Sequence, residues 1–291
     1  MELHLQQNTH PDKAAQAAYD QLIAIHRQKE SILNTLELFF NKEKVDKWHK
    51  AHHKGHLPFF SNVLSGSPLI ILSGDVGCGK TALAHSVATP LANIINKRIT
   101  CFETPSNIRG GGLVGEIGNR IVDAFQQVKK KLKPEEFGIL IIDEADDLAT
   151  DRDQNQAHHE DRAGLNVLIK QLDLVSREKL SLAVLLITNR LKVLDPAVIR
   201  RAVNVIEFER PDETGRRLVF EKLFAGTGIN DAGINELILA SEHKDTPYSF
   251  SDLIQKVGRQ ALFLAVQTDQ PFSKDLYIKV LKNVKPSPLI K

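Results

Sequence analysis

The sequence predicts an α/β fold: a five-stranded parallel sheet carrying a phosphate-binding loop, followed by a small helical domain. Between residues 68 and 208, short apolar runs alternate with stretches of helical periodicity, which is typical of βαβ units. The first run, 69–72, leads into a glycine-rich loop and then into a helical stretch. Beyond Pro211 the apolar residues follow helical spacing alone, which indicates a separate helical domain.

The expected organisation has four parts. Residues 1–45 form a helical lead-in, because their apolar residues recur at helical spacing. We expect this apolar stripe to pack against the main domain rather than to bind a partner. Residues 46–211 form the phosphate-binding core, 212–284 the helical domain and 285–291 a polar tail.

Five apolar runs are the expected strands. In an open parallel sheet, residues that directly follow a strand lie at its carboxyl edge, where ligands bind. The third run ends in Asp143 and Glu144, and the fourth ends at Asn189. These polar residues are therefore expected at the ligand-binding edge. The predicted strands cover residues 69–72, 97–102, 139–142, 182–188 and 203–208.

The glycine-rich loop at 74–81 has the full G-x-x-x-x-G-K-[ST] spacing of a nucleotide phosphate loop. Backbone N–H groups and the positive end of the following helix build an anion site there. Lys80 is expected to reach the β- and γ-phosphates, and the Thr81 hydroxyl to coordinate Mg²⁺. The flanking strand and helix disfavour a chance glycine turn. The predicted nucleotide contacts are Gly74, Asp75, Val76, Gly77, Cys78, Gly79, Lys80, Thr81 and Ala82.

Asp143, Glu144 and Asn189 are the predicted catalytic groups of the core. Asp143 would hold Mg²⁺, directly or through water, and Glu144 would orient and deprotonate the attacking water. Asn189 would hydrogen-bond the γ-phosphate or that water. The structural alternatives are a helix N-terminus with favourable charges for the acidic pair and a turn-forming Asn.

Composition excludes several classes of protein. The 291 residues carry a net charge of +2, which gives no electrostatic argument for binding nucleic acid or a membrane. The two cysteines, Cys78 and Cys101, offer no disulfide framework. No apolar run approaches the length of a bilayer span and no signal peptide opens the chain, so a cytoplasmic protein is expected. Because it precedes a helix, Cys78 is expected to have some thiolate character.

A histidine cluster lies near the start of the predicted core. On a helix its spacing suits a metal-binding face, but no cysteine or paired carboxylate completes the set. A solvated polar turn is therefore favoured, and the same holds for His158 and His159. The cluster comprises His49, His52, His53 and His56.

Four motifs together resemble those of AAA+ ATPases in order and spacing. They are the phosphate loop, the acidic run 141–146, the pair 188–189 and the segment 194–201. The resemblance extends over about residues 60–265. It implies an ATP hydrolase that uses ATP and Mg²⁺, with a parallel five-stranded sheet and a C-terminal helical lid. It also implies a ring, usually a homo-hexamer.

The resemblance also implies roles for single residues. Asn189 stands where the family has its sensor-1 residue. Arg200 and Arg201 stand where the family places arginine fingers, which act on nucleotide bound by the neighbouring subunit. Arg201 is slightly preferred as the finger, and a solvated pair at a helix end is the alternative.

The chain departs from the family pattern in two places. Asp75 and Val76 stand where the family often has two prolines, which should change the stiffness of the loop. The stretch 248–253 resembles members that lack a sensor-2 arginine. Lys256 and Arg259 are poor substitutes by their spacing, so no lid residue is assigned to the nucleotide.

The glycine-rich stretch 110–116 looks like the first pore loop of AAA+ protein remodellers, with Leu113 where an aromatic residue is common. The resemblance therefore implies an ATP-driven remodeller of a protein client. Among compact single-ring members, the pachytene-checkpoint type opens HORMA-domain proteins and has bacterial relatives in antiviral (phage) defence. The alternative reading of 110–116 is an ordinary surface loop.

Two other functions remain as alternatives. A DNA-directed AAA+ ATPase, of the helicase-loader or clamp-loader type, is disfavoured by the near-neutral charge and by the lack of room for a winged-helix domain after the lid. A small-molecule kinase or GTPase is disfavoured by the acidic pair, the sensor position and the arginine pair.

Overall fold

The computed structural model describes the chain except residues 1–2, 54–56, 58–68, 106–115, 134–135, 148–158, 179, 244 and 291. For residues 147, 159–163 and 165 it describes the backbone alone. The chain divides into two compact units. The sheet unit comprises Met1–Asp20, Arg27–Ser73 and Thr81–Glu207. The helical unit comprises Gln21–His26, Gly74–Lys80 and Phe208–Lys291.

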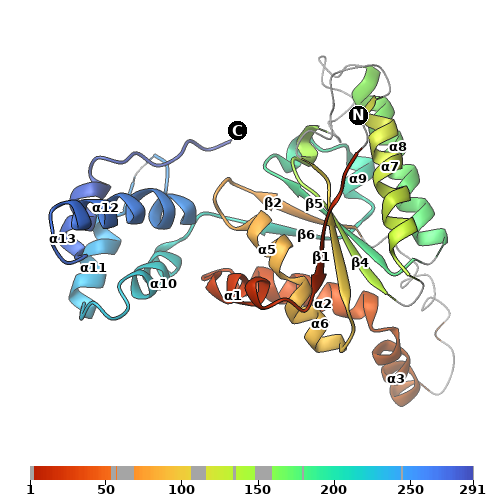
Figure 1. The fold of residues 1–291 in the computed structure, drawn as a ribbon, viewed down its shortest axis with the longest axis horizontal. Coiled ribbons are helices and arrows are strands. Elements are labelled where there is room, and N and C mark those ends of the chain that lie inside the picture. Colours follow the sequence, from red (N-terminus) through yellow and green to blue (C-terminus); the bar gives the residue numbers. More distant parts are fainter. Residues whose placement is uncertain are drawn as a thin grey trace. The chain divides into compact units, whose positions relative to one another are not determined.

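The sheet has six strands in the order β1-β3-β4-β5-β2-β6 (Figure 1). β3 pairs in parallel with β4, β4 with β5, and β5 with β2, so the centre of the sheet is parallel as predicted. The strands are β1 (Gln6–His10), β2 (Leu69–Gly74), β3 (Ile99–Glu103), β4 (Phe137–Ile142), β5 (Leu182–Thr188) and β6 (Ala202–Phe208).

The predicted number of strands was wrong by one. The additional strand, β1, pairs antiparallel with β3 from Gln6 opposite Glu103 to His10 opposite Ile99. Its first four residues are exposed. An edge strand pairs through its backbone and does not need an apolar run, and therefore hydrophobic periodicity does not detect it.

The central strands are buried on both faces, as expected of a parallel sheet. On one face, residues of β2, β4 and β5 pack with helices α7 (Glu116–Lys131) and α8 (His159–Arg177) in one core. Figure 1 shows these two helices side by side, and they contact each other. Their buried side chains include Ile121, Phe125, Leu168 and Leu172. Each fully buried side chain of this size contributes about 1.5–3 kcal/mol relative to exposure.

The alternate residues of the same strands, such as Ile70, Ile139 and Leu185, are buried as well. Buried residues of α2, α5 and α6 include Ile32, Leu83 and Leu91. The remaining helical segments of this part of the chain are α1 (Lys13–Gln21), α2 (His26–Phe40), α3 (Lys42–His52), α5 (Lys80–Ser86), α6 (Ala88–Ile95), α9 (Pro196–Ile199) and the 3-10 turns η1 (Ala145–Asp147) and η2 (Leu191–Val193).

The helical unit has its own aromatic core, which confirms the predicted small helical domain. The ring of Tyr277 lies 5.7 Å from that of Phe220 and 5.6 Å from that of Phe224, both edge to face. The Tyr277 hydroxyl donates to the carbonyl of Leu253 at 2.8 Å. The segments are α10 (Glu213–Leu223), α11 (Asp231–Ala240), the π-helical η3 (Asp252–Gly258), α12 (Arg259–Gln267) and α13 (Lys274–Leu281). Among the described residues, no helix is both long enough and apolar enough to cross a membrane.

Candidate functional site

The phosphate loop has a backbone that requires glycine. Gly74, Gly77 and Gly79 have φ values of +128°, +75° and +96°. At Gly74 a Cβ would also lie 2.0 Å from the carbonyl oxygen of Phe208, a clash that excludes any side chain. The glycines of the motif therefore have a steric cause in this chain. Helix α5 begins at Lys80, which orients N–H groups at the loop.

Lys80 is buried and its ammonium group is held by the loop itself. Nζ donates to the carbonyl oxygens of Gly74 and Asp75, both at 2.7 Å. A buried ammonium needs such acceptors because desolvation penalises its charge. The predicted phosphate-binding cation thus points back to the backbone of its own loop.

Thr81 and Asp143 lie in direct contact. The Thr81 hydroxyl donates to Asp143 Oδ2 at 2.9 Å, although the two residues are 62 positions apart in the sequence. α5 supplies the hydroxyl and the carboxyl end of β4 supplies the carboxylate. The structure therefore brings together the two predicted metal-binding residues.

Glu144 is exposed and has a left-handed backbone, with φ of +54°. Its N–H donates to Asp143 Oδ1 at 2.7 Å. A non-glycine residue in this region stores strain of order 1–3 kcal/mol and occurs often at functional sites. The Glu144 side chain is thus accessible to solvent directly after β4.

The end of β5 is tied to the turn after β4. Thr188 Oγ1 hydrogen-bonds Asp146 Oδ1, and the Asn189 N–H donates to Asp146 Oδ2 at 3.3 Å. Sequence reasoning assigned no role to Asp146 or Thr188. Asp146 lies within the acidic run 141–146 and Thr188 within the pair 188–189, so their positions in these motifs could have indicated a role. Asp146 fixes the position of Asn189 relative to the acidic turn.

The two arginines of the α9 region differ in their contacts. Arg201 donates to both carboxylate oxygens of Asp173 on α8, at 3.1 and 3.3 Å, and to the carbonyl of Ala197. Arg200 is exposed, and its Nε donates to the carbonyl of Pro196 at 3.3 Å. Arg200 is thus the more accessible of the two.

The expectation of thiolate character at Cys78 was wrong. The side chain is 1% exposed, and burial raises the pKa of the thiol to about 11, against a weaker opposing effect of Lys80. Sequence reasoning considered only the nearby helix terminus. In the folded chain the desolvation of the thiolate outweighs that dipole.

The expected pore loop and the histidine clusters lie partly outside the described residues. Residues 110–115 of the proposed pore loop, including Leu113, lie outside the described residues, as do His56 and His158. The ring of His49 stacks on that of His53 at 5.7 Å. Within the described part of the chain, no three His, Cys, Asp or Glu side chains are grouped as metal ligands.

Two basic residues of the lid have partners within the helical unit. Lys256 Nζ donates to the carbonyl of Lys285 at 2.9 Å. Arg259 donates to Gln255 Oε1 on its own helical segment. Both basic side chains are therefore engaged within the helical unit.

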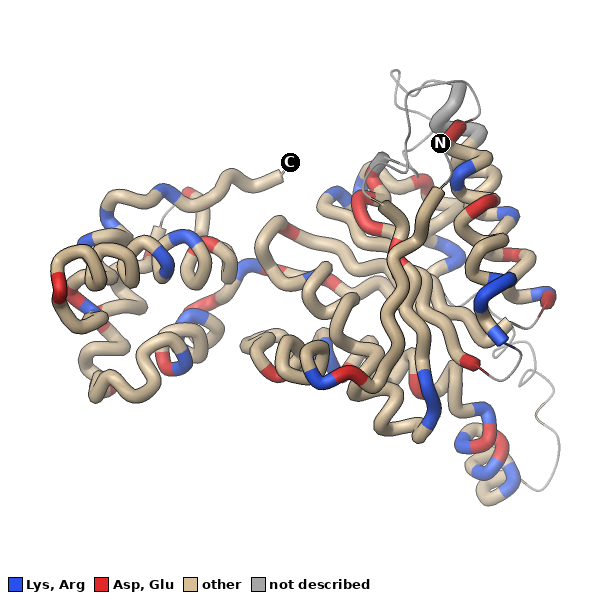
Figure 2. Tube along the Cα trace, viewed as in Figure 1, with Lys and Arg blue, Asp and Glu red and all other residues tan. Residues whose placement is uncertain are grey.

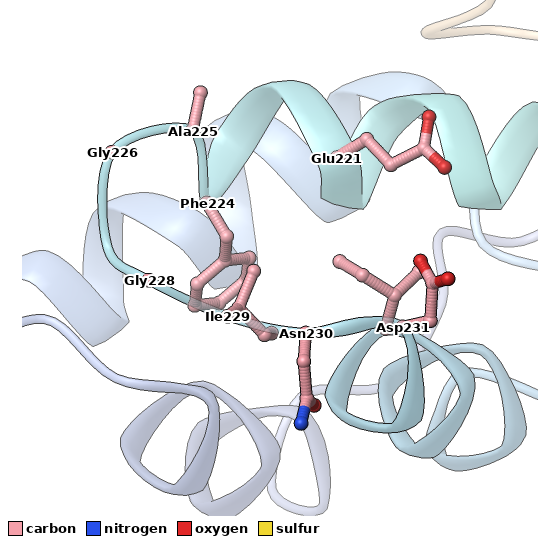
Figure 3. A pocket seen from close by; sticks show the side chains of 9 residues that line it. Glu221, Phe224, Ala225, Gly226, Gly228, Ile229, Asn230 and Asp231 are labelled. Carbon is pink, nitrogen blue, oxygen red and sulfur yellow. The ribbon is translucent and has the colours of Figure 1, made fainter.

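The helical unit also contains a hollow of about 530 Å³ between α10 and α11 (Figure 3). Phe224 and Ile229 supply apolar lining, and Glu221 and Asp231 supply carboxylates. The side chain of Asn230 is engaged in capping α11, where it accepts from the Gly233 N–H. None of these residues belongs to the predicted site.

Fold and site together define a P-loop nucleotide-binding protein with a helical lid. Residues 70–210 match the model of the ATPase family associated with various cellular activities (AAA). CD-NTase-associated protein 6 of Escherichia coli strain MS 115-1 is 34% identical over 289 residues, covering 96% of this chain and 93% of that protein. The chain therefore belongs to the AAA ATPase family, and the resemblance seen in its motifs is confirmed.

Solved structures agree with this assignment. A chain of the E. coli MS115-1 HORMA:CdnC:Trip13 complex matches with a TM-score of 0.90 and 32% identity, covering 99% of this chain and 98% of that one. Rhizobiales Trip13 matches with a TM-score of 0.72 and 28% identity, covering 97% and 98%. The similarity thus extends over nearly the whole chain, including the helical unit.

Proposed function

We propose that this protein hydrolyses ATP with Mg²⁺ in a homo-oligomeric ring and uses the energy to remodel a HORMA-domain protein in a bacterial antiviral system. The observation that carries the ATPase part is the hydrogen bond between Thr81 and Asp143. A hydroxyl of the phosphate loop and a carboxylate that follows β4 lie 2.9 Å apart, which supports a metal ion shared by the two side chains.

The donor set at this point fits Mg²⁺. A hydroxyl and a carboxylate are hard oxygen ligands, which Mg²⁺ prefers, and it usually keeps several waters and binds substrate phosphates. Mg²⁺ held by Thr81 and Asp143 would neutralise negative charge on the β- and γ-phosphates. Lys80 would exchange the carbonyls of Gly74 and Asp75 for phosphate oxygens, and the N–H groups of 77–82 would complete the anion site.

Glu144 serves as the general base in this proposal. Its carboxylate accepts a proton from water while the water oxygen bonds to the γ-phosphorus. The bond between the γ-phosphorus and the bridging oxygen breaks, and ADP leaves. Asn189, fixed by Asp146, orients the water or the γ-phosphate.

Arg200 is the favoured arginine finger, acting on nucleotide bound by a neighbouring subunit. Its exposure leaves the guanidinium available to a second copy, whereas Arg201 is already bidentate to Asp173. A finger supplied in trans makes hydrolysis depend on assembly. We expect a homo-hexamer.

A protein client is favoured over DNA. One matched structure, at 32% identity, is a complex named for HORMA, CdnC and Trip13, and this chain covers 98% of the matched chain. Figure 2 shows Lys and Arg interspersed with Asp and Glu along the helices, and the net charge is only +2. A nucleic-acid groove needs clustered positive charge instead.

The test uses the purified protein, ATP, Mg²⁺ and the HORMA protein of the matched E. coli MS115-1 complex. We expect the HORMA protein to stimulate ATP turnover and to change conformation only while ATP is hydrolysed. Single- and double-stranded DNA of equal mass concentration serve as the comparison. Stimulation by DNA and not by the HORMA protein would favour the loader-type alternative.

A further inference from the structure

Arg210 links the phosphate loop to two other parts of the helical unit. Its side chain is only 5% exposed and forms an ion pair with Asp75 in the loop. Nη1 donates to the carbonyls of Pro247 and Ser287, the latter at 2.8 Å, and Nη2 donates to the carbonyl of Pro288 at 3.1 Å. One guanidinium thus contacts three stretches of chain far apart in sequence.

Asp75 depends on this contact for its position. Its carboxylate is 14% exposed, so it has little access to water as an alternative partner. One oxygen accepts from Arg210 and the other from the Val76 N–H at 3.1 Å. Removing one member of a largely buried pair leaves an uncompensated charge, which is strongly unfavourable. Both carboxylate oxygens of Asp75 are therefore engaged, one by the Arg210 guanidinium and the other by the backbone of the loop.

Residues 284–288, which we term the strap, are hydrogen-bonded to other residues of the helical unit. Asp252 is 2% exposed and receives hydrogen bonds from the N–H and hydroxyl of Ser287, at 3.1 and 2.6 Å. Burial raises the pKa of Asp252, but hydrogen bonds from Ser287 and Ser249 outweigh this effect, so the pKa is lowered and the group stays charged. The Tyr248 hydroxyl and Lys256 bind the strap carbonyls of Val284 and Lys285.

The same network contacts the phosphate loop at a second point. Ser249 and Asp252 hydrogen-bond each other, and the Ser251 N–H donates to the carbonyl of Gly77 at 3.0 Å. At Gly77 a Cβ would lie 2.7 Å from Ser249 Oγ, which shows how closely the loop lies against this turn. The loop is thus held at residue 75 by the Arg210 side chain and at residue 77 by the backbone N–H of Ser251.

We propose that Arg210 is a positioning residue for the nucleotide, holding the phosphate loop in its binding conformation with the strap as its anchor. This rests on the proposed function, in which the loop binds ATP. When only a fraction of molecules has the competent loop, the apparent dissociation constant rises by the inverse of that fraction. Bound nucleotide restores the conformation, so the effect falls on binding and KM more than on kcat.

The experiment measures the affinity for a fluorescent N-methylanthraniloyl derivative of ATP with Mg²⁺, together with steady-state KM and kcat. Arg210→Ala and Asp75→Asn are each expected to weaken binding about tenfold. The double variant should bind no more weakly than either single variant, because both substitutions break the same Arg210–Asp75 pair. Arg210→Lys, which keeps the charge but not the fork of donors, should lie between wild type and Arg210→Ala. Arg217→Ala is the matched control, since Arg217 on α10 bonds Asn235 instead.

The strap is tested by Ser287→Ala, which removes the hydroxyl bond to Asp252. It should weaken binding in the wild-type background and have no effect in the Arg210→Ala background. Additive effects of Arg210→Ala and Asp75→Asn, or wild-type affinity in Asp75→Asn, would overturn the proposal. Asp75→Asn and Ser287→Ala decide the matter if Arg210→Ala does not fold. Unchanged binding in Lys80→Ala would instead contradict the nucleotide site itself.

Discussion

Arg201 and Asp173 form an ion pair within one chain, with Nε 3.1 Å from Oδ1, while the adjacent Arg200 is exposed. The pair lies partly in solvent, so its contribution to stability is small, at most about 1 kcal/mol. Its consequence is geometric: the ion pair holds the Arg201 guanidinium against α8, whereas the Arg200 side chain is exposed to solvent.

We therefore expect Arg200→Ala to reduce ATP turnover more than Arg201→Ala, by about 10³-fold or more if Arg200 is the finger. Subunits of Arg200→Ala mixed with wild type should depress turnover, because each defective finger inactivates a neighbour. Turnover per subunit should also rise with protein concentration as rings form. A larger loss in Arg201→Ala, or turnover per subunit independent of concentration, would contradict this assignment.

Lys80 and Glu144 should fail in different ways. Lys80→Ala removes the ammonium group that we propose binds the phosphates, so this variant should lose nucleotide binding. Glu144→Gln keeps the shape of the side chain but cannot accept a proton, so it should bind ATP and not hydrolyse it. Equilibrium binding and phosphate release, measured on the same preparations, separate the two. Hydrolysis by Glu144→Gln at the wild-type rate would exclude Glu144 as the base.

Leu113 remains a prediction from the sequence. If it grips a polypeptide, Leu113→Ala should still assemble and retain most ATPase activity without client, but should lose client-stimulated turnover and client conversion. The two activities are measured side by side. Client conversion at the wild-type rate would remove the argument for a pore loop and strengthen the DNA-directed alternative.

Cys78 should react slowly with iodoacetamide. With a pKa of about 11 instead of 9.0, its thiolate fraction at pH 8 is about a hundredfold below that of an ordinary thiol. The rate should rise about tenfold per pH unit up to about pH 11. Peptide-level mass spectrometry follows Cys78 and Cys101 separately, with the unfolded chain as reference. Labelling that saturates near pH 8 would show that the thiol is not buried in solution.

His10 should make the sheet unit sensitive to acid. Burial lowers its pKa from 6.5, against a weaker opposing effect of Asp12. Nδ1 bonds Thr89 Oγ1 at 2.8 Å, and Nε2 is buried and has no hydrogen-bond partner. The unfolded chain then binds the proton more tightly, so stability is fully present above pH 6.5 and is lost as pH falls through the lower folded pKa.

Between the two pKa values, each pH unit costs about 1.4 kcal/mol of unfolding free energy. Urea unfolding of wild type and His10→Asn from pH 7.5 to 5 measures this dependence. The difference in unfolding free energy between the two proteins should change over that range. A constant difference would mean that His10 is protonated equally in both states.

The site divides into what local patterns predict and what they do not. The phosphate loop, Asp143, Glu144 and Asn189 follow from short motifs, because each must occupy a fixed place at the end of an apolar strand. β1 was not predicted, since its polar residues pair through backbone alone. The prediction of thiolate character at Cys78 was wrong, because the burial that raises the pKa of its thiol depends on segments distant in the sequence.

The sequence by itself determined the family, the sheet core, the helical domain and the residue types of the phosphate loop. These depend on periodicity and on motifs of a few adjacent residues. Only the tertiary structure decided that Arg201 is held by Asp173, that Asp146 fixes Asn189, and that Arg210 joins Asp75 to Ser287. Such contacts connect residues tens to hundreds of positions apart. Polar side chains carry no periodic signal for their partners, so only the folded chain reveals the pairs.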